Sequence, residues 1–122
     1  MTYYRRNIDQ KLLEWKDSPR RKPLLIRGAR QVGKSSAVRH FAKCFKYFVE
    51  VNLERQPSIR QLFTKDIDVK RTCEDISAST GIPIVAGKTL LFIDEIQVSQ
   101  EGIMSLRYFK EDYPELHVIA AG

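Results

Sequence analysis

The stretch PLLIRGARQVGKS at residues 23–35 decides the fold of this chain. Residues 23–27 contain a short apolar run bounded by proline and glycine, which is typical of a buried parallel strand. From Lys34 to about Cys44, apolar residues recur at steps of three and four, beginning with Val38 and Phe41. This spacing predicts a helix. The stretch therefore predicts a strand, a glycine-bearing loop and a helix in direct succession.

The loop fits the pattern G-x-x-x-x-G-K-[ST] at every fixed position and lies between a strand and a helix, as that pattern requires. Its two glycines allow the backbone to turn so that successive N–H groups point at one anion, and the positive end of the helix dipole reinforces them. The alternative, an ordinary glycine-rich turn that caps a helix, is disfavoured by this context. The residues expected to contact the phosphates of a nucleotide are Gly28, Ala29, Arg30, Gln31, Val32, Gly33, Lys34, Ser35 and Ser36.

Two carboxylates, Asp94 and Glu95, end residues 89–93, the most strand-like run of the chain. Beside a strand that carries the phosphate loop, Asp94 would face Mg²⁺ directly or through a water, and Glu95 could activate the attacking water. The alternative is a polar strand end or a helix N-cap. We expect Lys34, which should reach the β- and γ-phosphates, to act in catalysis together with Glu95. We expect Ser35 and Asp94 to bind the metal, with ATP and Mg²⁺ as cofactors.

The nucleotide is expected to carry adenine. A GTPase normally has an Asn/Thr-Lys-x-Asp guanine reader and an Asp-x-x-Gly switch. The nearest candidates, TKDI at residues 64–67 and DEIQ at residues 94–97, fit neither pattern. Small-molecule kinases usually have a more glycine-rich loop than this one, so that class is a minor alternative.

Strand and helix patterns alternate along the rest of the chain. Strands are expected at residues 47–53 and 116–120, helices at residues 8–16 and 100–112, and weaker helices near residues 59–63 and 69–80. This alternation predicts a parallel sheet with right-handed crossovers, in an open three-layer α/β architecture. Such folds bind ligands at the carboxyl ends of their strands, where the phosphate loop and the acidic pair both fall.

Composition places the chain among globular domains. Its 122 residues, 43% of them hydrophobic, fit one domain with a real core. The longest apolar run, LLFI at residues 90–93, is far shorter than the roughly 20 residues of a membrane span. Because the N-terminus has no signal-peptide pattern, we expect a cytoplasmic protein. Cys44 and Cys73 lack the spacing of a zinc site or a disulfide framework and are expected to be reduced and buried.

A formal net charge of +6 raises the alternative of a basic nucleic-acid-binding module. The 21 basic residues are spread along the chain, however, and the densest cluster is only Arg20, Arg21 and Lys22. A solvated basic surface is therefore favoured over nucleic-acid contact.

Three stretches together resemble a group of prokaryotic P-loop ATPases of the AAA superfamily: LIRGARQVGKS at residues 25–35, LLFIDEIQ at residues 90–97 and VIAAG at residues 118–122. The similarity extends to YRR at residues 4–6 and VNLE at residues 51–54. The resemblance implies a sheet ordered 5-1-4-3-2, with a lid domain and a further C-terminal domain downstream.

The resemblance also implies which parts of such a domain fall within residues 1–122. The polar sensor residue would lie at or just beyond Gly122, and the fifth strand and any arginine finger would lie further on. We therefore expect residues 1–122 to be the N-terminal part of an AAA-type ATP-binding domain, truncated after the fourth strand.

The implied activity is ATP binding with Mg²⁺-dependent hydrolysis, impaired in residues 1–122 by the missing parts. The alternative is an ATP-dependent switch or scaffold with little turnover. The expected partners are ATP and the downstream lid and C-terminal domain. A second copy of the chain is also expected, because residues 23–27 would form an unpaired sheet edge.

Overall fold

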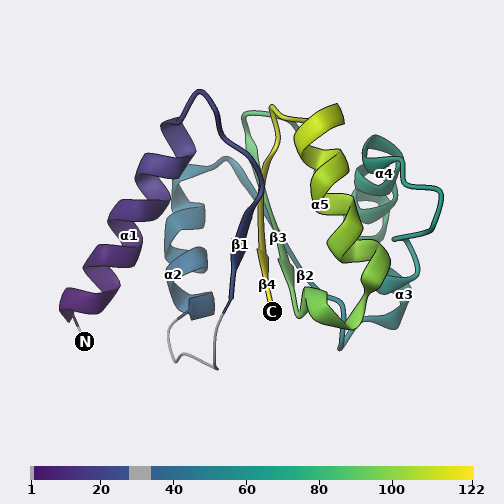
Figure 1. The fold of residues 1–122 in the computed structure, drawn as a ribbon, viewed down its shortest axis with the longest axis horizontal. Helices are drawn as coiled ribbons and strands as arrows, with labels where there is room; N and C mark the ends of the chain where they lie inside the picture. Colours follow the sequence, from purple (N-terminus) through teal and green to yellow (C-terminus); the bar gives the residue numbers. More distant parts are fainter. Residues whose placement is uncertain (1, 28–33) are drawn as a thin grey trace.

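The chain folds into an open sheet between two layers of helices (Figure 1). The computed structural model describes the backbone of residues 2–27 and 34–122 and the side chains of residues 8–27 and 35–122. The strands are β1 (Leu24–Ile26), β2 (Tyr47–Asn52), β3 (Thr89–Asp94) and β4 (His117–Ala121). One layer holds α1 (Thr2–Asp17), α2 (Lys34–Phe41) and the 3₁₀ turn η1 (Ala42–Cys44). The other holds α3 (Pro57–Arg60), α4 (Val69–Thr80), the 3₁₀ turn η2 (Ile96–Val98) and α5 (Gln100–Asp112).

The four strands are parallel and lie in the order β1-β4-β3-β2. This arrangement confirms the predicted α/β class, and it matches the 1-4-3-2 part of the order that the resemblance implies. Among the described residues, β1 pairs with β4 alone and forms one edge of the sheet, as expected for residues 23–27. Self-association through this edge stays a prediction. None of the described helices is long and apolar enough to cross a membrane.

The central strands β3 and β4 are buried on both faces because their side chains alternate between the two helical layers. Leu90 and Phe92 pack in the cluster with α1 and α2, whereas Leu91 and Ile93 pack in the cluster with α4 and α5. Phe92 is fully buried, and so is Phe109 of α5. Truncation of either ring to alanine would cost about 3–5 kcal/mol.

Local signals in the sequence set the ends of α4 and α5. Asp68 caps α4 by accepting a hydrogen bond from the Arg71 N–H at 3.2 Å, and Gly81 ends that helix in the left-handed region at φ 75°. Ser99 caps α5 by accepting from the Gly102 N–H at 2.9 Å. α5 has the predicted bounds, and α4 agrees with the pattern that ends near Gly81.

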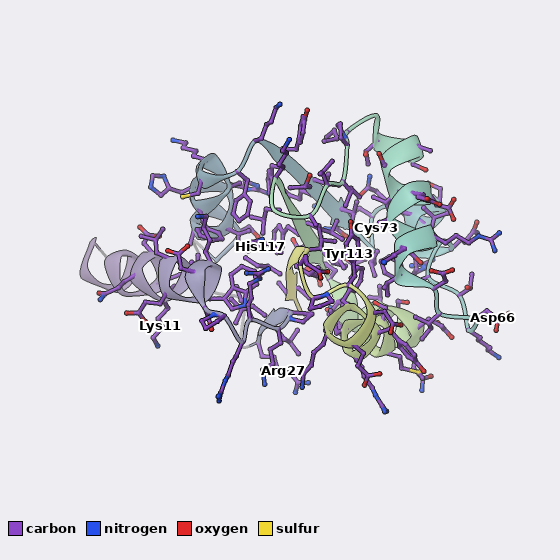
Figure 2. All side chains as sticks on the ribbon, turned by 90° about the horizontal axis from the view of Figure 1, so that it is seen from above. Lys11, Arg27, Asp66, Cys73, Tyr113 and His117 are labelled. Carbon is purple, nitrogen blue, oxygen red and sulfur yellow. The ribbon has the colours of Figure 1, made fainter. Side chains whose placement is uncertain are left out.

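Three sequence expectations need correction. The short helix expected near residues 59–63 is α3, which begins earlier because Pro57 suits the first helical position, and it ends at Arg60. The first helix begins at Thr2 rather than at Ile8, so the predicted element was too short. Cys44 is exposed, contrary to the expectation that both cysteines are buried, because the helix tightens into η1 and turns this residue outward. Cys73 is buried beside Tyr113 (Figure 2), and burial raises the pKa of its thiol to about 12. This thiol is therefore unreactive.

The basic cluster at residues 20–22 lies at the amino-terminal edge of the sheet, away from the ends of the strands where ligands bind. Arg21 donates hydrogen bonds to the backbone oxygens of Lys16 at 3.2 Å, Pro114 at 3.2 Å and Glu115 at 3.0 Å. Burial lowers its pKa, and the charge of Glu115 partly opposes that effect. Arg21 thus ties the end of α1 to the loop before β4, and the cluster does not present three free cations to a polyanion.

His117 joins α1 to the start of β4. Its Nε2–H donates to the Lys16 carbonyl oxygen at 3.1 Å, and its ring lies edge-on to Trp15 at a centroid distance of 5.5 Å. The His117 side chain is buried. Burial is the largest cause that lowers its pKa; the charges of Arg21 and Lys16 lower it further, while the bond to the Lys16 carbonyl and the charge of Asp17 oppose this.

This lowered pKa predicts a loss of stability in mild acid. Because the unfolded chain binds a proton to His117 near the ordinary pKa of about 6.5 and the folded chain does so only at lower pH, the free energy of unfolding falls as pH drops from about 7.5 to 5.5. Thermal unfolding across this range measures the effect. His117→Gln, which retains a side-chain donor, should lose less stability over the same range. If the free energy of unfolding depended equally on pH in the parent chain and in His117→Gln, His117 would not be the cause of the loss.

Candidate nucleotide site

The carboxyl edge of the sheet brings together the segments that the sequence singles out. Ile26, the last residue of β1, is paired in register with Ala121 of β4, and Ile93 of β3 with Ala120. Asp94 is therefore level with Ile26 across β4, at about 10 Å, twice the spacing of neighbouring strands. α2 begins at this same edge (Figure 1).

The predicted phosphate loop falls only partly within the described chain. Gly28, Ala29, Arg30, Gln31, Val32 and Gly33 lie outside the described residues, as does the side chain of Lys34. Ser35 is partly buried and Ser36 is exposed, both in the first turn of α2. The first N–H groups of a helix have no partner within it and attract anions. The start of α2 thus suits a phosphate group in the position that the motif requires.

Asp94 lies on the α2 side of the sheet. It is two residues beyond Phe92, which packs against that layer, and strand residues two apart share a face. Asp94 Oδ1 accepts a hydrogen bond from the Glu95 N–H at 2.9 Å. The carboxylate therefore leaves the sheet toward the helix that follows the phosphate loop.

Glu95 has an unusual backbone. Its φ of 55° lies in the left-handed region, and no other non-glycine residue among residues 2–27 and 34–122 has a positive φ. For a residue with a Cβ this conformation costs roughly 1–2 kcal/mol. Such strain is found where the surrounding structure needs one side chain in a particular place. Glu95 Oε1 also accepts a hydrogen bond from Gln97 Nε2 at 2.6 Å.

Asp94 and Glu95 line an open depression of about 760 Å³. Arg39 of α2 crosses it to Glu50 of β2 in a two-point ion pair, with N–O distances of 2.9 and 2.7 Å. The pKa of Arg39 is raised, chiefly by its hydrogen bond to Glu50, then by the charge of Glu50 and more weakly by that of Asp94. The other residues lining the depression are Asn52, Glu54, Arg55 and Gln56.

The loop after β2 forms a fixed wall of this depression. Asn52 Oδ1 accepts hydrogen bonds from the Glu54 and Arg55 N–H groups at 3.0 and 2.9 Å, and Gln56 Oε1 accepts from the Asn52 N–H at 2.7 Å. Asn52 is also paired in register with Asp94. Sequence reasoning missed these residues. The sequence held one indication of Asn52: like Asp94, it is a polar residue at the carboxyl end of a strand.

Ser35 and Asp94, the residues expected to bind Mg²⁺, would need the phosphates of a bound nucleotide to complete the metal site. Among the described side chains, no group of three or more His, Cys, Asp or Glu residues is arranged to hold a metal ion. Mg²⁺ in nucleotide sites is usually held by one or two carboxylates, waters and the phosphates themselves. A carboxylate from Asp94 and a hydroxyl from Ser35 are hard oxygen donors of the kind that Mg²⁺ prefers, so these residues fit that mode.

The chain was also compared with protein-family models. The model described as "AAA domain" matches residues 20–122, most of the chain. The chain belongs to this family and is an AAA-type, P-loop ATPase-like domain. Membership supports nucleotide binding at the level of the family. No curated protein matches the chain closely enough to count as a relative.

The strained backbone of Glu95 gives a stability prediction. Glycine relieves a left-handed conformation, so Glu95→Gly should be more stable than Glu95→Ala by about 1 kcal/mol. This difference corresponds to a melting temperature about 4 °C higher for a domain of this size. Thermal unfolding of the two variants measures it.

Glu74 provides the matched control, because it is exposed in the interior of α4. There the order should reverse, with glycine about 1 kcal/mol less stable than alanine. Glycine below alanine at both positions would rule out strain at Glu95.

Proposed function

We propose that the chain binds ATP with Mg²⁺ at the carboxyl edge of its sheet and hydrolyses it to ADP and phosphate, with the reduced turnover expected for residues 1–122. The observation that carries the proposal is the meeting, at one edge, of the first turn of α2 and the Asp94–Glu95 pair that ends β3. Family membership supports the nucleotide-binding part.

Each residue has a role in this proposal. Residues 28–33 and the first turn of α2, including Ser36, would bind the phosphates, and Lys34 would contact the β- and γ-phosphates. Ser35 and Asp94 would hold Mg²⁺. When bound, Mg²⁺ neutralises the negative charge that develops on the phosphate oxygens.

Glu95 acts on the attacking water. It orients the water and accepts its proton as the oxygen bonds to the γ-phosphorus, while the bond from that phosphorus to the β–γ bridging oxygen breaks. The strained backbone of Glu95 and its position beside the open depression support this role.

The nucleic-acid alternative has less support. Arg21, the central residue of the densest basic cluster, binds three backbone carbonyl groups. A basic nucleic-acid-binding module would bind DNA in a salt-dependent way, and Lys34→Ala would leave that binding unchanged.

Mg-ATP should stabilise the chain against heat. A ligand at 100 times its dissociation constant adds about 2.7 kcal/mol to the free energy of unfolding, which raises the melting temperature by about 10 °C for this size. Lys34→Ala should remove the shift. A shift of equal size in the variant would place the nucleotide elsewhere, and no shift in either protein would contradict ATP binding.

Turnover should depend on Glu95. Loss of a general base typically lowers the rate by about 10²–10⁴-fold, so Glu95→Gln should hydrolyse Mg-ATP at least about 100-fold more slowly and still show the thermal shift. Glu74→Gln, the same change on the exposed side of α4, should keep the parent rate. Comparable turnover in Glu95→Gln would exclude Glu95 as the base. Nucleotide binding with no turnover in the parent chain would favour the switch.

A further inference from the structure

The side chain of Gln97 folds back onto the Glu95 carboxylate. Gln97 Nε2 donates to Glu95 Oε1 at 2.6 Å across only two residues. The bond engages one oxygen of the carboxylate and limits rotation of the side chain. An amide is neutral at every pH of interest, so it can hold a carboxylate in place without competing for the water proton.

The turn that carries Gln97 is fixed at both ends. Ile96 is buried in the core cluster with α4 and α5. The Ser99 N–H donates to the Ile96 carbonyl oxygen at 3.0 Å, while the Ser99 hydroxyl caps α5. The backbone of Gln97 therefore lies between two anchored residues, and its side chain leaves from a defined point.

Gly122 lies against the other side of Gln97. A Cβ at Gly122 would overlap Gln97 Oε1 and would lie 3.2 Å from the Gln97 backbone nitrogen and 3.3 Å from its Cδ. Gly122 is itself held beside β1, because its N–H donates to the Ile26 carbonyl oxygen at 3.2 Å. The Gln97 amide thus lies between the Glu95 carboxylate and Gly122, where an added Cβ would displace the amide oxygen.

We propose that Gln97 is a positioning residue that holds the Glu95 carboxylate in the orientation for water activation. Gly122 lies beside the Gln97 amide and has no side chain that would displace it. The inference rests on the hydrolytic function proposed above. Holding a reacting group in one geometry removes part of the entropy cost of reaching the transition state. A Glu95 side chain without Gln97 should remain chemically competent but be oriented correctly less often.

The test is steady-state hydrolysis of Mg-ATP by Gln97→Met, which preserves side-chain length and removes the amide. The kcat should fall by about tenfold, while KM and the thermal shift with Mg-ATP stay at the parent values, because Gln97 contacts Glu95 rather than the phosphates. Gln100→Met makes the same change at an exposed position in the first turn of α5 and should leave kcat unchanged.

A second variant, at Gly122, tests the same contact between Gln97 and Glu95. Gly122→Ala should displace the Gln97 amide and lower kcat by a similar factor. In a Gln97→Met background it should lower kcat little further, because the contact is already absent. Additive losses would mean that Gly122 acts independently of Gln97.

The outcomes separate this inference from the function on which it rests. If Glu95→Gln abolishes turnover and Gln97→Met keeps the parent kcat, the positioning role is wrong and the proposed hydrolysis stands. If Gln97→Met raises KM and removes the thermal shift, Gln97 serves nucleotide binding and the inference is also wrong. If the parent chain has no turnover, or if turnover persists in both Lys34→Ala and Glu95→Gln, the proposed function itself fails.

Discussion

The parallel pairing of β3 with β4, buried between two helical layers, is the constraint on which the rest of the structure depends. A polar side chain within either strand would lose its contact with water, so the first carboxylates along β3 appear where the strand leaves the core, at Asp94 and Glu95. Parallel strands all end at the same edge. The register across β4 then sets the distance between this acidic pair and the end of β1, and the candidate site lies at that one edge of the sheet.

At that edge, hydrogen bonds and an ion pair hold side chains in fixed orientations, and the backbone of Glu95 is strained. Glu95 has a left-handed backbone that a glycine would adopt more easily, and its carboxylate is held by Gln97. Arg39 is paired with Glu50 across the same depression, and the charge of Asp94 also raises the pKa of Arg39. These contacts orient side chains that would otherwise rotate freely in solvent. Of these features, only the left-handed backbone of Glu95 opposes stability, which is why we connect it with the proposed reaction.

Much of this arrangement could be predicted from the sequence, for identifiable reasons. Pro114 stops a helix and so predicted the end of α5, and the alternation of strands and helices predicted the parallel sheet. Residues 28–33 lie outside the described residues, so the phosphate loop rests on its motif and family. The contact of Gln97 with Glu95, the ion pair of Arg39 and the carbonyl contacts of Arg21 could not be predicted, because each depends on side-chain directions and on segments that meet only in the folded chain.

The central claim is that nucleotide binds at the carboxyl edge of the sheet. The most direct measurement is a titration of the isotope-labelled chain with Mg-ATP, followed through its backbone amide signals by NMR. The account predicts that the signals of Ser35, Asp94 and Gln97 shift in a saturable way, while those of Arg20 and Lys22 at the opposite edge do not. Saturable shifts confined to Arg20 and Lys22, or none at any concentration, would contradict it.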